Sequence, residues 1–358
     1  MFISKHHYAV ELAKAGNTVY YMNGPEQAGK MKRGEITITN TEYGNLFLIK
    51  HRLPFPYILK FKARWLYDYL LTFHVTNVLR KIPKQVDLVW SFDLSDTIPL
   101  RLFPKKIKKI YMPVDELHGN VAISAAQGAD VIASVTNEIL SKFESLSTHK
   151  LFLNHGVADY FINKNVNDSI NNPIQVGLSG NFLRTDIDHE TLKQIISSHP
   201  HVVFNFWGLI DFHQSNLLAP SDNNTLAFIE ELKAMPNVKL YGQVSPEILA
   251  VELKKMDCFL ICYDINKDYS KGTNYHKVLE YLAAGKVVVS NNITTYGNHP
   301  GLIEMPQERN NKSLPELFNR VIAELDEYNS ISKQQERIVF ASSHTYGNQL
   351  KKIESYLN

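Results

Sequence analysis

The segment between Lys271 and Ser290 carries the side chains whose types and spacing best suit ligand binding. Lys277, Glu280 and Tyr281 stand at positions i, i+3 and i+4, so they share one face if the segment is helical. A carboxylate on such a face can accept hydrogen bonds from the two neighbouring hydroxyls of a ribose. The same spacing fits an amphipathic helix whose lysine and glutamate lie in solvent, and spacing alone favours that plainer interpretation.

The start of this expected helix suits an anion. Thr273 or Asn274 can cap it, and Gly285 can end it in a left-handed conformation. A helix N-terminus presents free N–H groups and the positive end of the helix dipole, which favour a phosphate. The start of the expected helix is therefore suited to bind a phosphate group.

A second candidate is the glycine turn that runs from Gly177 to Arg184. Small residues such as Gly180, followed by Asn181, let the backbone approach a diphosphate closely, and Arg184 can neutralise it. The turn does not match the dinucleotide fingerprint Gly-x-Gly-x-x-Gly, so an NAD site is weakly supported. An ordinary strand-to-helix turn with Arg184 in solvent is the alternative.

A third candidate follows an expected strand in the first half of the chain. The expected strand over residues 109–113 is followed directly by Asp115, Glu116 and His118. In parallel α/β sheets, ligands bind at the carboxyl ends of the strands. Asp115 can act as a base on an acceptor hydroxyl, and His118 can donate a hydrogen bond toward a diphosphate. A polar loop in which Asp115 caps a helix explains the same residues.

His6 and His7 form a poor metal site, because adjacent side chains on a helix point apart. No metal and no other cofactor is expected, since a helix N-terminus and basic side chains can hold a diphosphate. Residues 55–65 and 104–110 mix basic with aromatic or apolar residues and can lie on an anionic membrane. A charged edge on a core-packed helix is the commoner explanation of such stretches.

Composition excludes several classes of protein. The 358 residues are 44% hydrophobic and 21% charged, which is typical of a globular protein, and the net charge of +2 gives no case for a nucleic-acid partner. Both cysteines lie in one apolar run, so a disulfide scaffold and a cysteine zinc site are excluded. No secretory signal and no membrane span is apparent, and a cytoplasmic location is expected.

The elements that must position these residues alternate between strands and helices. Continuous apolar strands separated by helices indicate parallel sheets covered on both faces, an α/β fold. Expected strands are residues 18–22, 46–49, 86–91, 109–113, 131–134, 151–153, 175–179, 202–207, 238–241, 258–263 and 287–290. Expected helices include residues 59–79, 137–143, 190–197, 225–234, 246–255 and 275–284, with a mostly helical tail from 314 to 357.

A break in composition divides the alternation into two halves. Residues 163–173 are polar, rich in Asn and closed by Pro, which is typical of a linker. The expected organisation is a first domain over 1–160, a linker over 161–173, a second domain over 174–335 and a C-terminal helix over 336–358 that packs back on the first domain. One feature is unusual: a doubly wound domain opens with a strand, yet here a helix begins almost at once. Either the sheet lacks its first strand or the chain starts upstream of Met1.

The segment from Asn274 to Ser290 resembles the donor-site helix of GT-B glycosyltransferases, which carry Lys-x-x-Glu-Tyr-Leu-Ala-x-Gly-Lys-Pro-Val-Val. Only Val287 departs from it, in the place of proline. The glycine turn near Gly177 and the stretch Asn154-His155-Gly156-Val157 are similar to other parts of the same family, as are residues 5–21. The resemblance covers nearly the whole chain.

This resemblance implies two Rossmann-like domains facing a cleft. It implies transfer of a hexose from a nucleotide sugar to a hydroxyl of a glycan or lipid-linked acceptor, with retention, in cell-surface polysaccharide biosynthesis and with peripheral membrane contact. Glu280 would bind the donor ribose, while Lys277, Thr273, Asn274, Gly180, Asn181 and Arg184 would complete the donor site. Many retaining members carry a second glutamate eight positions earlier, where this chain has Gly272. A sugar-nucleotide epimerase and a non-catalytic subunit of the same architecture remain as alternatives.

Overall fold

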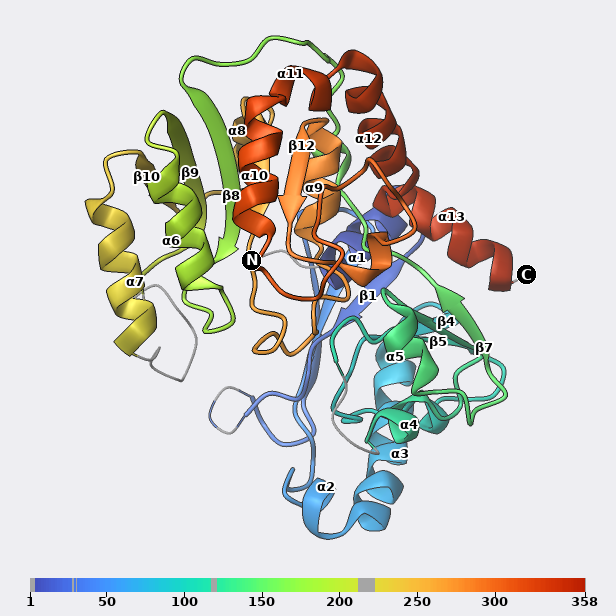
Figure 1. Cartoon of the computed structure of the whole chain (residues 1–358). Helices are drawn as coiled ribbons and strands as arrows, with labels where there is room; N and C mark the ends of the chain where they lie inside the picture. The colour runs from blue at the N-terminus through green and yellow to red at the C-terminus, as the bar shows by residue number, and fades with distance from the viewer. Residues whose placement is uncertain (1–3, 28, 30, 117–120, 212–222, 358) are drawn as a thin grey trace. The chain divides into compact units, whose positions relative to one another are not determined.

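The structure is a computed structural model that describes residues 4–27, 29, 31–116, 121–211 and 223–357 (Figure 1). The chain divides into two compact units. Unit 1 comprises Met1–Asn154 and Tyr346–Asn358, and unit 2 comprises His155–Thr345.

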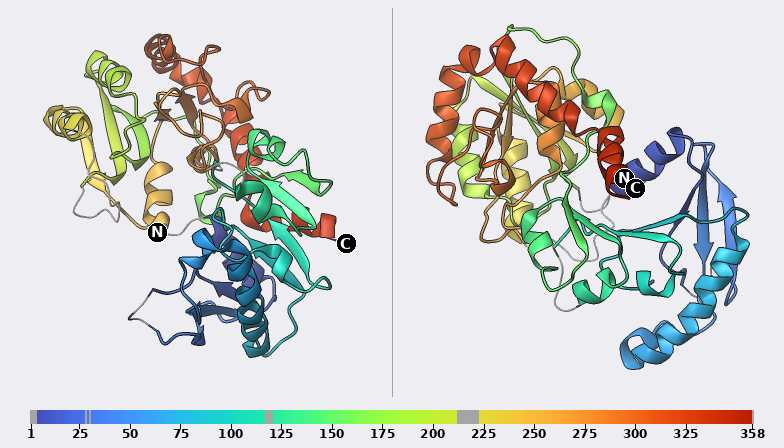
Figure 2. Two further views of the ribbon diagram at one scale, coloured as in Figure 1. Left: turned by 90° about the horizontal axis from the view of Figure 1, so that it is seen from below. Right: turned by 90° about the vertical axis from the view of Figure 1, so that its right-hand side faces the viewer.

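Unit 1 contains two separate sheets, drawn in blue (β1 to β3) and in teal to green (β4 to β7) in Figure 2. The first has the order β1-β3-β2, with β1 parallel to β3 and β2 antiparallel to it. The second is parallel throughout, with the order β4-β5-β6-β7. The strands are β1 (Val19–Met22), β2 (Ile36–Asn40), β3 (Leu46–His51), β4 (Leu88–Ser91), β5 (Lys108–Tyr111), β6 (Val131–Ser134) and β7 (His149–Phe152).

Helices cover these sheets. Tyr8 of α1 shares one apolar cluster with strand residues of the second sheet and with Leu350 and Ile353 of α13, so the C-terminal helix packs into unit 1. Gly16 adopts φ +91° just after α1, the left-handed conformation that favours glycine at a helix end. The helices are α1 (Ser4–Lys14), α2 (Leu59–Lys62), α3 (Arg64–Lys81), α4 (Val121–Ala126), α5 (Asn137–Ser141) and α13 (Tyr346–Leu357), with a short helix η1 (Leu100–Leu102).

Unit 2 is a doubly wound α/β unit around one five-stranded parallel sheet of order β10-β9-β8-β11-β12 (Figure 1). Every residue of β11 and β12 is buried, because helices cover both faces. The strands are β8 (Ile174–Asn181), β9 (Val202–Leu209), β10 (Val238–Gly242), β11 (Cys258–Ile261) and β12 (Val287–Ser290).

The helices of unit 2 fall into two layers. α10 packs against α6 on one face, whereas α8 and α12 pack against α9 on the other. A single large apolar cluster runs through the sheet and both layers. The elements are η2 (Asp159–Phe161), α6 (His189–Ser198), α7 (Asn223–Ala234), α8 (Pro246–Leu253), α9 (Lys277–Ala284), η4 (Thr294–Tyr296), α10 (Leu314–Ala323), α11 (Leu325–Tyr328) and α12 (Ile331–Ser343).

The expected α/β alternation is confirmed, and β6 and β12 have the expected bounds. Strand β2 was not expected, because its Ile-Thr-Ile-Thr-Asn sequence is short and lies among charged residues and turns. The expected helix over residues 59–79 is interrupted at Ala63, whose φ and ψ of −150° and 69° are not helical. Within the part of the chain that the structure describes, no helix combines the length and the apolar composition needed to cross a membrane.

Candidate functional site

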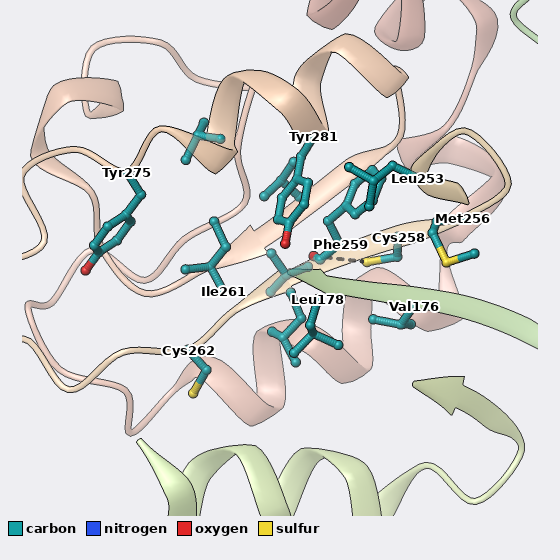
Figure 3. Packing of buried hydrophobic residues seen from close by; sticks show 14 of the residues in the cluster. Val176, Leu178, Leu253, Met256, Cys258, Phe259, Ile261, Cys262, Tyr275 and Tyr281 are labelled. Carbon is teal, nitrogen blue, oxygen red and sulfur yellow. Dashed lines mark hydrogen bonds between the residues drawn. The ribbon is translucent and has the colours of Figure 1, made fainter. Parts of the chain in front are cut away.

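The centre of the candidate site in unit 2 is the carboxyl end of β8. Ser179 accepts a hydrogen bond from Lys277 Nζ at its carbonyl oxygen (2.6 Å), and its backbone N–H donates to the Tyr281 hydroxyl (2.6 Å). The Tyr281 ring stacks on Phe259 of β11, with ring centroids 4.3 Å apart (Figure 3). Tyr281 therefore belongs to the core, and it fixes α9 against the sheet so that Lys277 reaches the end of β8.

Glycines make this close approach possible. Gly180 has φ +143°, and a Cβ built there would lie 2.6 Å from Lys277 Nζ. Its neighbour across the strands, Gly208, has φ +141°, and a Cβ there would lie 1.7 Å from the carbonyl oxygen of Gly180. A side chain at either position would displace its neighbours, so both glycines are required by the packing of this strand end.

Lys277 is a buried cation, 8% exposed. Its ammonium also donates to the Tyr263 hydroxyl (2.7 Å) and lies 5.0 Å from the centroid of that ring. An ammonium has three N–H donors, and two of them are used within the protein. Among the described residues, the third donor has no partner.

Glu280 lies one turn further along α9 and is half-buried. Its carboxylate makes no hydrogen bond or ion pair with any residue that the structure describes. Burial raises the pKa of Glu280 to about 7, although the positive charge of Lys277 acts in the opposite direction. A half-buried carboxylate without hydrogen-bond donors is costly, and a ligand that supplies donors would remove that cost.

Asp268 organises the loop that leads into α9. Its side chain is fully buried and accepts hydrogen bonds from the backbone N–H groups of Ser270 (3.0 Å) and Gly272 (2.9 Å) and from the Tyr275 hydroxyl (2.7 Å). Gly272 has φ +65°, and a Cβ there would lie 2.9 Å from the Asn292 carbonyl oxygen. The loop before α9 is therefore held in one conformation by buried hydrogen bonds and by a glycine with positive φ.

The expected capping of α9 by Thr273 or Asn274 is wrong. The helix begins at Lys277, and its N-cap is His276, which has helical φ and ψ and makes no side-chain capping bond. Thr273 and Asn274 are buried in the preceding loop instead, where the Thr273 carbonyl oxygen accepts the N–H of Thr295 (3.1 Å). The expected C-cap is confirmed, because Gly285 has φ +91°.

Arg184 carries a charge that is already compensated. Its Nε donates to Asp186 (2.8 Å), a second contact joins the same two side chains, and Asp268 lies 3.5 Å away. The hydrogen bond to Asp186 raises the pKa of Arg184 above its ordinary value. Its neighbour Asn181 is half-buried and accepts the N–H of Leu183 (2.9 Å), so it shapes the turn after β8.

Two histidines lie near the start of α9. The rings of His155 and His276 are 6.2 Å apart and meet edge to face. Burial, and to a smaller extent His276, lowers the pKa of His155 to about 3, so its imidazole is neutral at physiological pH. His276 is exposed.

Sequence reasoning missed other residues of this region. Arg309 donates to the carbonyl oxygen of Lys271, so it brings a second exposed cation to the loop before α9, and no sequence spacing indicates this. Asp268 could have been found from its turn pattern. It is followed by Ser270 and Gly272, and an aspartate ahead of such residues often accepts the N–H groups of a turn.

Asp186 and Asp188 form an Asp-x-Asp pattern, but Asp186 pairs with Arg184 and Asp188 caps α6. Among the described residues, no group of three His, Cys, Asp or Glu side chains could hold a metal ion.

The candidate residues of unit 1 are only partly described. Asp115 is exposed in a bend after β5, and Glu116 pairs with Lys142. His118 lies outside the described residues. The structure thus places Asp115 at the carboxyl end of the unit 1 sheet, and the roles predicted for Asp115 and His118 stay predictions.

No protein-family model matches the chain, and no curated protein matches it by sequence. Solved structures do match. A sucrose-phosphate synthase from Thermosynechococcus elongatus has a TM-score of 0.67 at 12% identity, over 98% of this chain and 91% of that chain. The HepE protein of Anabaena, solved in complex with UDP and glucose, has a TM-score of 0.63 at 12% identity, over 94% of this chain and 99% of that chain.

A trehalose-6-phosphate structure from E. coli bound with UDP-2-fluoro glucose has a TM-score of 0.67 at 10% identity, over 99% of this chain and 96% of that chain. These neighbours are GT-B proteins. At such low identity the likeness shows the fold alone. The chain has the GT-B fold, with two Rossmann-like units, as the sequence resemblance implied.

Proposed function

We propose that this chain is a glycosyltransferase that moves a hexose from a nucleotide sugar to a hydroxyl of a glycan or glycolipid acceptor, as a step in cell-surface polysaccharide biosynthesis. The observation that carries the proposal is Glu280, a half-buried carboxylate with no hydrogen-bond donor among the described residues and a pKa of about 7. The two ribose hydroxyls of a nucleotide are a matching pair of donors. Neighbours of the same fold were solved with UDP and glucose and with UDP-2-fluoro glucose.

The donor diphosphate is proposed to lie beside the end of β8 and the loop before α9. Lys277 has one N–H donor left for a phosphate oxygen, and Gly180, which has no side chain, lets the ammonium lie against the strand end. Lys271 and Arg309 add two exposed positive charges on the loop, near Thr273 and Asn274. Arg184 is proposed to contribute little to diphosphate binding, because a phosphate must compete with Asp186 for its guanidinium group.

The acceptor is proposed to bind on unit 1, with Asp115 as the base on its hydroxyl and His118 as a hydrogen-bond donor toward the donor diphosphate. Retention of configuration is proposed on the family resemblance. A glutamate in place of Gly272 would meet the Asn292 carbonyl oxygen and would have to adopt a left-handed conformation, so a retaining mechanism here must work without that side chain.

Peripheral membrane contact is proposed through α2 and α3. Trp65, Tyr69 and Phe73 recur every four residues on one face of α3 and are 75%, 59% and 55% exposed, while Phe61 of α2 is 70% exposed. Exposed aromatic rings beside Lys60 and Lys62 suit the interface of an anionic bilayer. Sedimentation with phosphatidylglycerol vesicles tests this: Trp65→Ser with Phe73→Ser should abolish binding, whereas Ile248→Ser on the exposed face of α8 should not.

A panel of nucleotide sugars tests the function itself. Free nucleotide released only in the presence of a glycan or lipid-linked acceptor supports a transferase, and the anomer formed shows whether configuration is retained. A new nucleotide sugar formed without acceptor means an epimerase, and no nucleotide binding at all means a non-catalytic subunit. Either of these two results would overturn the proposal.

Glu280→Gln identifies the site within this experiment. It keeps the size of the side chain but replaces a charge-assisted acceptor by a weaker one, so nucleotide affinity should fall about ten- to a hundredfold. Glu316→Gln is the matched control, because Glu316 also lies in the first turn of a helix but is exposed. Equal affinities for wild type and Glu280→Gln would remove Glu280 from the site.

A further inference from the structure

The helix α3 covers only part of the first sheet of unit 1. Its residue Val78 packs in one cluster with Ile36 and Ile49 of that sheet. The helix ends at Lys81, because Pro83 follows two residues later, cannot continue a helix and keeps the residue before it extended. At this point the chain turns away toward β4, and the neighbouring ends of β1 and β3 are left partly open.

A hollow of about 390 Å³ lies where the helix ends. Its volume is near the lower end of the range of about 300–1,000 Å³ that is usual for small-molecule sites. It combines apolar surface with a small number of polar side chains, as such sites do. We call it the α3-end hollow, and the residues that matter here are Tyr20, Asn40, Asn45, Phe47, Lys81 and Lys84.

Two stacked aromatic rings line the α3-end hollow. Tyr20 of β1 and Phe47 of β3 are paired in register, and their rings lie 5.2 Å apart with an angle of 20° between the ring planes. Both residues are only half-buried. The face of an aromatic ring carries partial negative charge, so it attracts the C–H groups of a saturated ring such as that of a sugar.

Side-chain amides flank Phe47. Asn40 is its register partner on β2, so the two side chains share one face, and Asn45 precedes Phe47 by two residues. Both asparagines are exposed, and neither side-chain amide makes a hydrogen bond with a residue that the structure describes. An amide donates and accepts hydrogen bonds, which matches sugar hydroxyls, since each hydroxyl also does both.

Two lysines bring positive charge to the α3-end hollow. Lys81 Nζ donates to the Ile36 carbonyl oxygen (3.0 Å), and Lys84 Nζ donates to the Thr18 hydroxyl (3.0 Å). An ammonium has three N–H donors, so two on each lysine are left without a partner among the described residues. No acidic side chain of the described residues lines the hollow, so it favours a ligand with negative charge.

The end of α3 favours a carboxylate over a phosphate. Lys81 is the last residue of the helix and lines the hollow, so the negative end of the helix dipole lies beside it. This partial charge opposes a doubly charged phosphate more strongly than a singly charged carboxylate. The last carbonyl groups of a helix lack partners within it, and sugar hydroxyls are donors that suit them.

The α3-end hollow is separate from the residues proposed to react. Lys84 precedes β4 and Asp115 follows β5, and β4 and β5 are parallel neighbours. The two residues therefore lie beyond opposite ends of these strands. A glycan unit bound in the hollow is a remote part of an acceptor, and such a second contact raises the affinity for long acceptors.

We propose that the α3-end hollow binds an acidic saccharide, a sugar unit that carries a carboxylate. The sugar ring packs against the aromatic pair, the two amides bind its hydroxyls, and the two lysines bind its carboxylate. The inference rests on the proposed function, since it names an acidic glycan as the acceptor. Binding at the hollow needs no nucleotide sugar, so it can be measured by itself.

Calorimetric titration of the full chain at low ionic strength is the first test. The acidic probes are trigalacturonate and a hyaluronan tetrasaccharide, maltotriose supplies sugar rings without charge, and inorganic phosphate supplies charge without a ring. At least one acidic probe should bind at least about tenfold more tightly than maltotriose and phosphate, and added salt should weaken it. No binding of either acidic probe, or equal affinity for phosphate, would overturn the proposal.

Variants locate the binding in the second test. Lys81→Gln with Lys84→Gln should lower the affinity for the acidic probe at least about tenfold. Lys50→Gln with Lys351→Gln is the matched control, because it removes the same charge from exposed positions of unit 1 outside the hollow, and the affinity should stay within about twofold. Equal losses in the two double variants would mean that the probe senses only the overall charge, and would overturn the proposal.

The aromatic pair has its own variant. Phe47→Leu keeps an apolar side chain but removes the flat ring, so the affinity for the acidic probe should fall about three- to tenfold. Melting temperatures show whether each variant is folded, and the exposed lysine variants carry the test if Phe47→Leu is not. An unchanged affinity in folded Phe47→Leu would remove the ring contact and with it the saccharide site.

Nucleotide binding distinguishes the failure of this proposal from the failure of the proposed function. All these variants should bind nucleotide as the wild type does, because the α3-end hollow lies in unit 1 and Glu280 lies in unit 2. Binding of an acidic probe by a chain that binds no nucleotide would support the hollow and overturn the transferase. Sugar transfer by a chain that binds neither acidic probe would do the reverse.

Discussion

At the residue scale, Glu280 is half-buried and has no hydrogen-bond or ion-pair partner among the described residues, and it is the burial that distinguishes it from a solvent-exposed helix glutamate. Its raised pKa makes proton release measurable. Ribose hydroxyls that donate to the ionised carboxylate lower its pKa in the complex, so nucleotide binding releases a proton below about pH 7. Nucleotide affinity should therefore rise from about pH 5 to about pH 7 and level off above.

Calorimetric titration across this pH range checks the prediction. In Glu280→Gln the affinity should be lower and nearly independent of pH, which separates Glu280 from the histidines that both proteins share. A flat profile in the wild type would mean that the nucleotide does not contact the ionised carboxylate.

The same pKa predicts a stability change without ligand. The pKa of Glu280 is about 7 in the folded protein and about 4.5 when unfolded, so the stability linked to its protonated form is complete below about pH 4.5 and is lost as the pH rises through 7. Glu280→Gln keeps a neutral side chain at every pH. It should stabilise the protein at pH 8 by about 1–2 kcal/mol, a value reduced by partial exposure to water, and have little effect near pH 4.5.

Thermal denaturation at the two pH values checks this expectation, with Glu316→Gln as control. A solvated glutamate would give no difference between the two pH values. The sequence pattern places Glu280 on the polar side of α9 but does not show how much of its side chain is covered. The pH-dependent stability change therefore could not be predicted from the sequence.

At the element scale, the junction of β8 and α9 depends on Gly180. Gly180→Ala places a Cβ 2.6 Å from Lys277 Nζ and forces φ +143° on a residue that disfavours it. We expect a stability loss of about 1–3 kcal/mol and a fall in nucleotide affinity of about tenfold, because the ammonium must move.

Gly242→Ala is a matched control for backbone strain. Gly242 also has positive φ (+71°), but a Cβ there meets nothing within 4 Å. The Gly242→Ala variant should be less stable than the wild type and should bind nucleotide with unchanged affinity. If both variants bind nucleotide as the wild type does, the position of Lys277 does not matter for the donor.

The loop before α9 depends on Asp268 in the same way. Asp268→Asn puts an N–H₂ group or a weaker acceptor against the N–H groups of Ser270 and Gly272, so chemical denaturation should show a loss of about 2–4 kcal/mol. Asp264→Asn, at a less buried position nearby, should cost less than about 1 kcal/mol. Similar losses in both variants would contradict the organising role of Asp268.

The elements around this site differ in how well the sequence predicts them. Strands such as β6 and β12 are short continuous apolar runs, and Gly285 marks the end of α9 unambiguously, so pattern alone was sufficient. The start of α9 was mispredicted because the Thr273 backbone hydrogen-bonds to Ser270 and to Thr295 of η4, and these tertiary contacts override a local capping preference. Arg309 could not be assigned from spacing, since its partner depends on how a loop folds, whereas the turn pattern after Asp268 does indicate a side chain that caps backbone N–H groups.

At the scale of the whole molecule, the proposed donor site belongs to one unit. Glu280, Lys277, Gly180 and Asp268 all lie in unit 2, which ends at Thr345. The helix that follows, α13, belongs to unit 1, where Tyr346, Leu350 and Ile353 are buried with Tyr8 of α1. Donor binding and the integrity of unit 1 should therefore be separable.

Deletion of residues 346–358 tests this separation. Exposing three large apolar side chains and the surface beneath them costs about 5–8 kcal/mol, which is comparable to the stability of a whole domain. Unit 1 should unfold or exchange its amides rapidly, while unit 2 keeps its protected amides and binds nucleotide with unchanged affinity. Leu350→Ala in the full chain should weaken unit 1 by about 2–5 kcal/mol and also leave nucleotide affinity unchanged. If the deletion abolished nucleotide binding while the amides of β8, β11 and β12 stayed protected, the donor site would need residues of unit 1, and its assignment to unit 2 alone would be wrong.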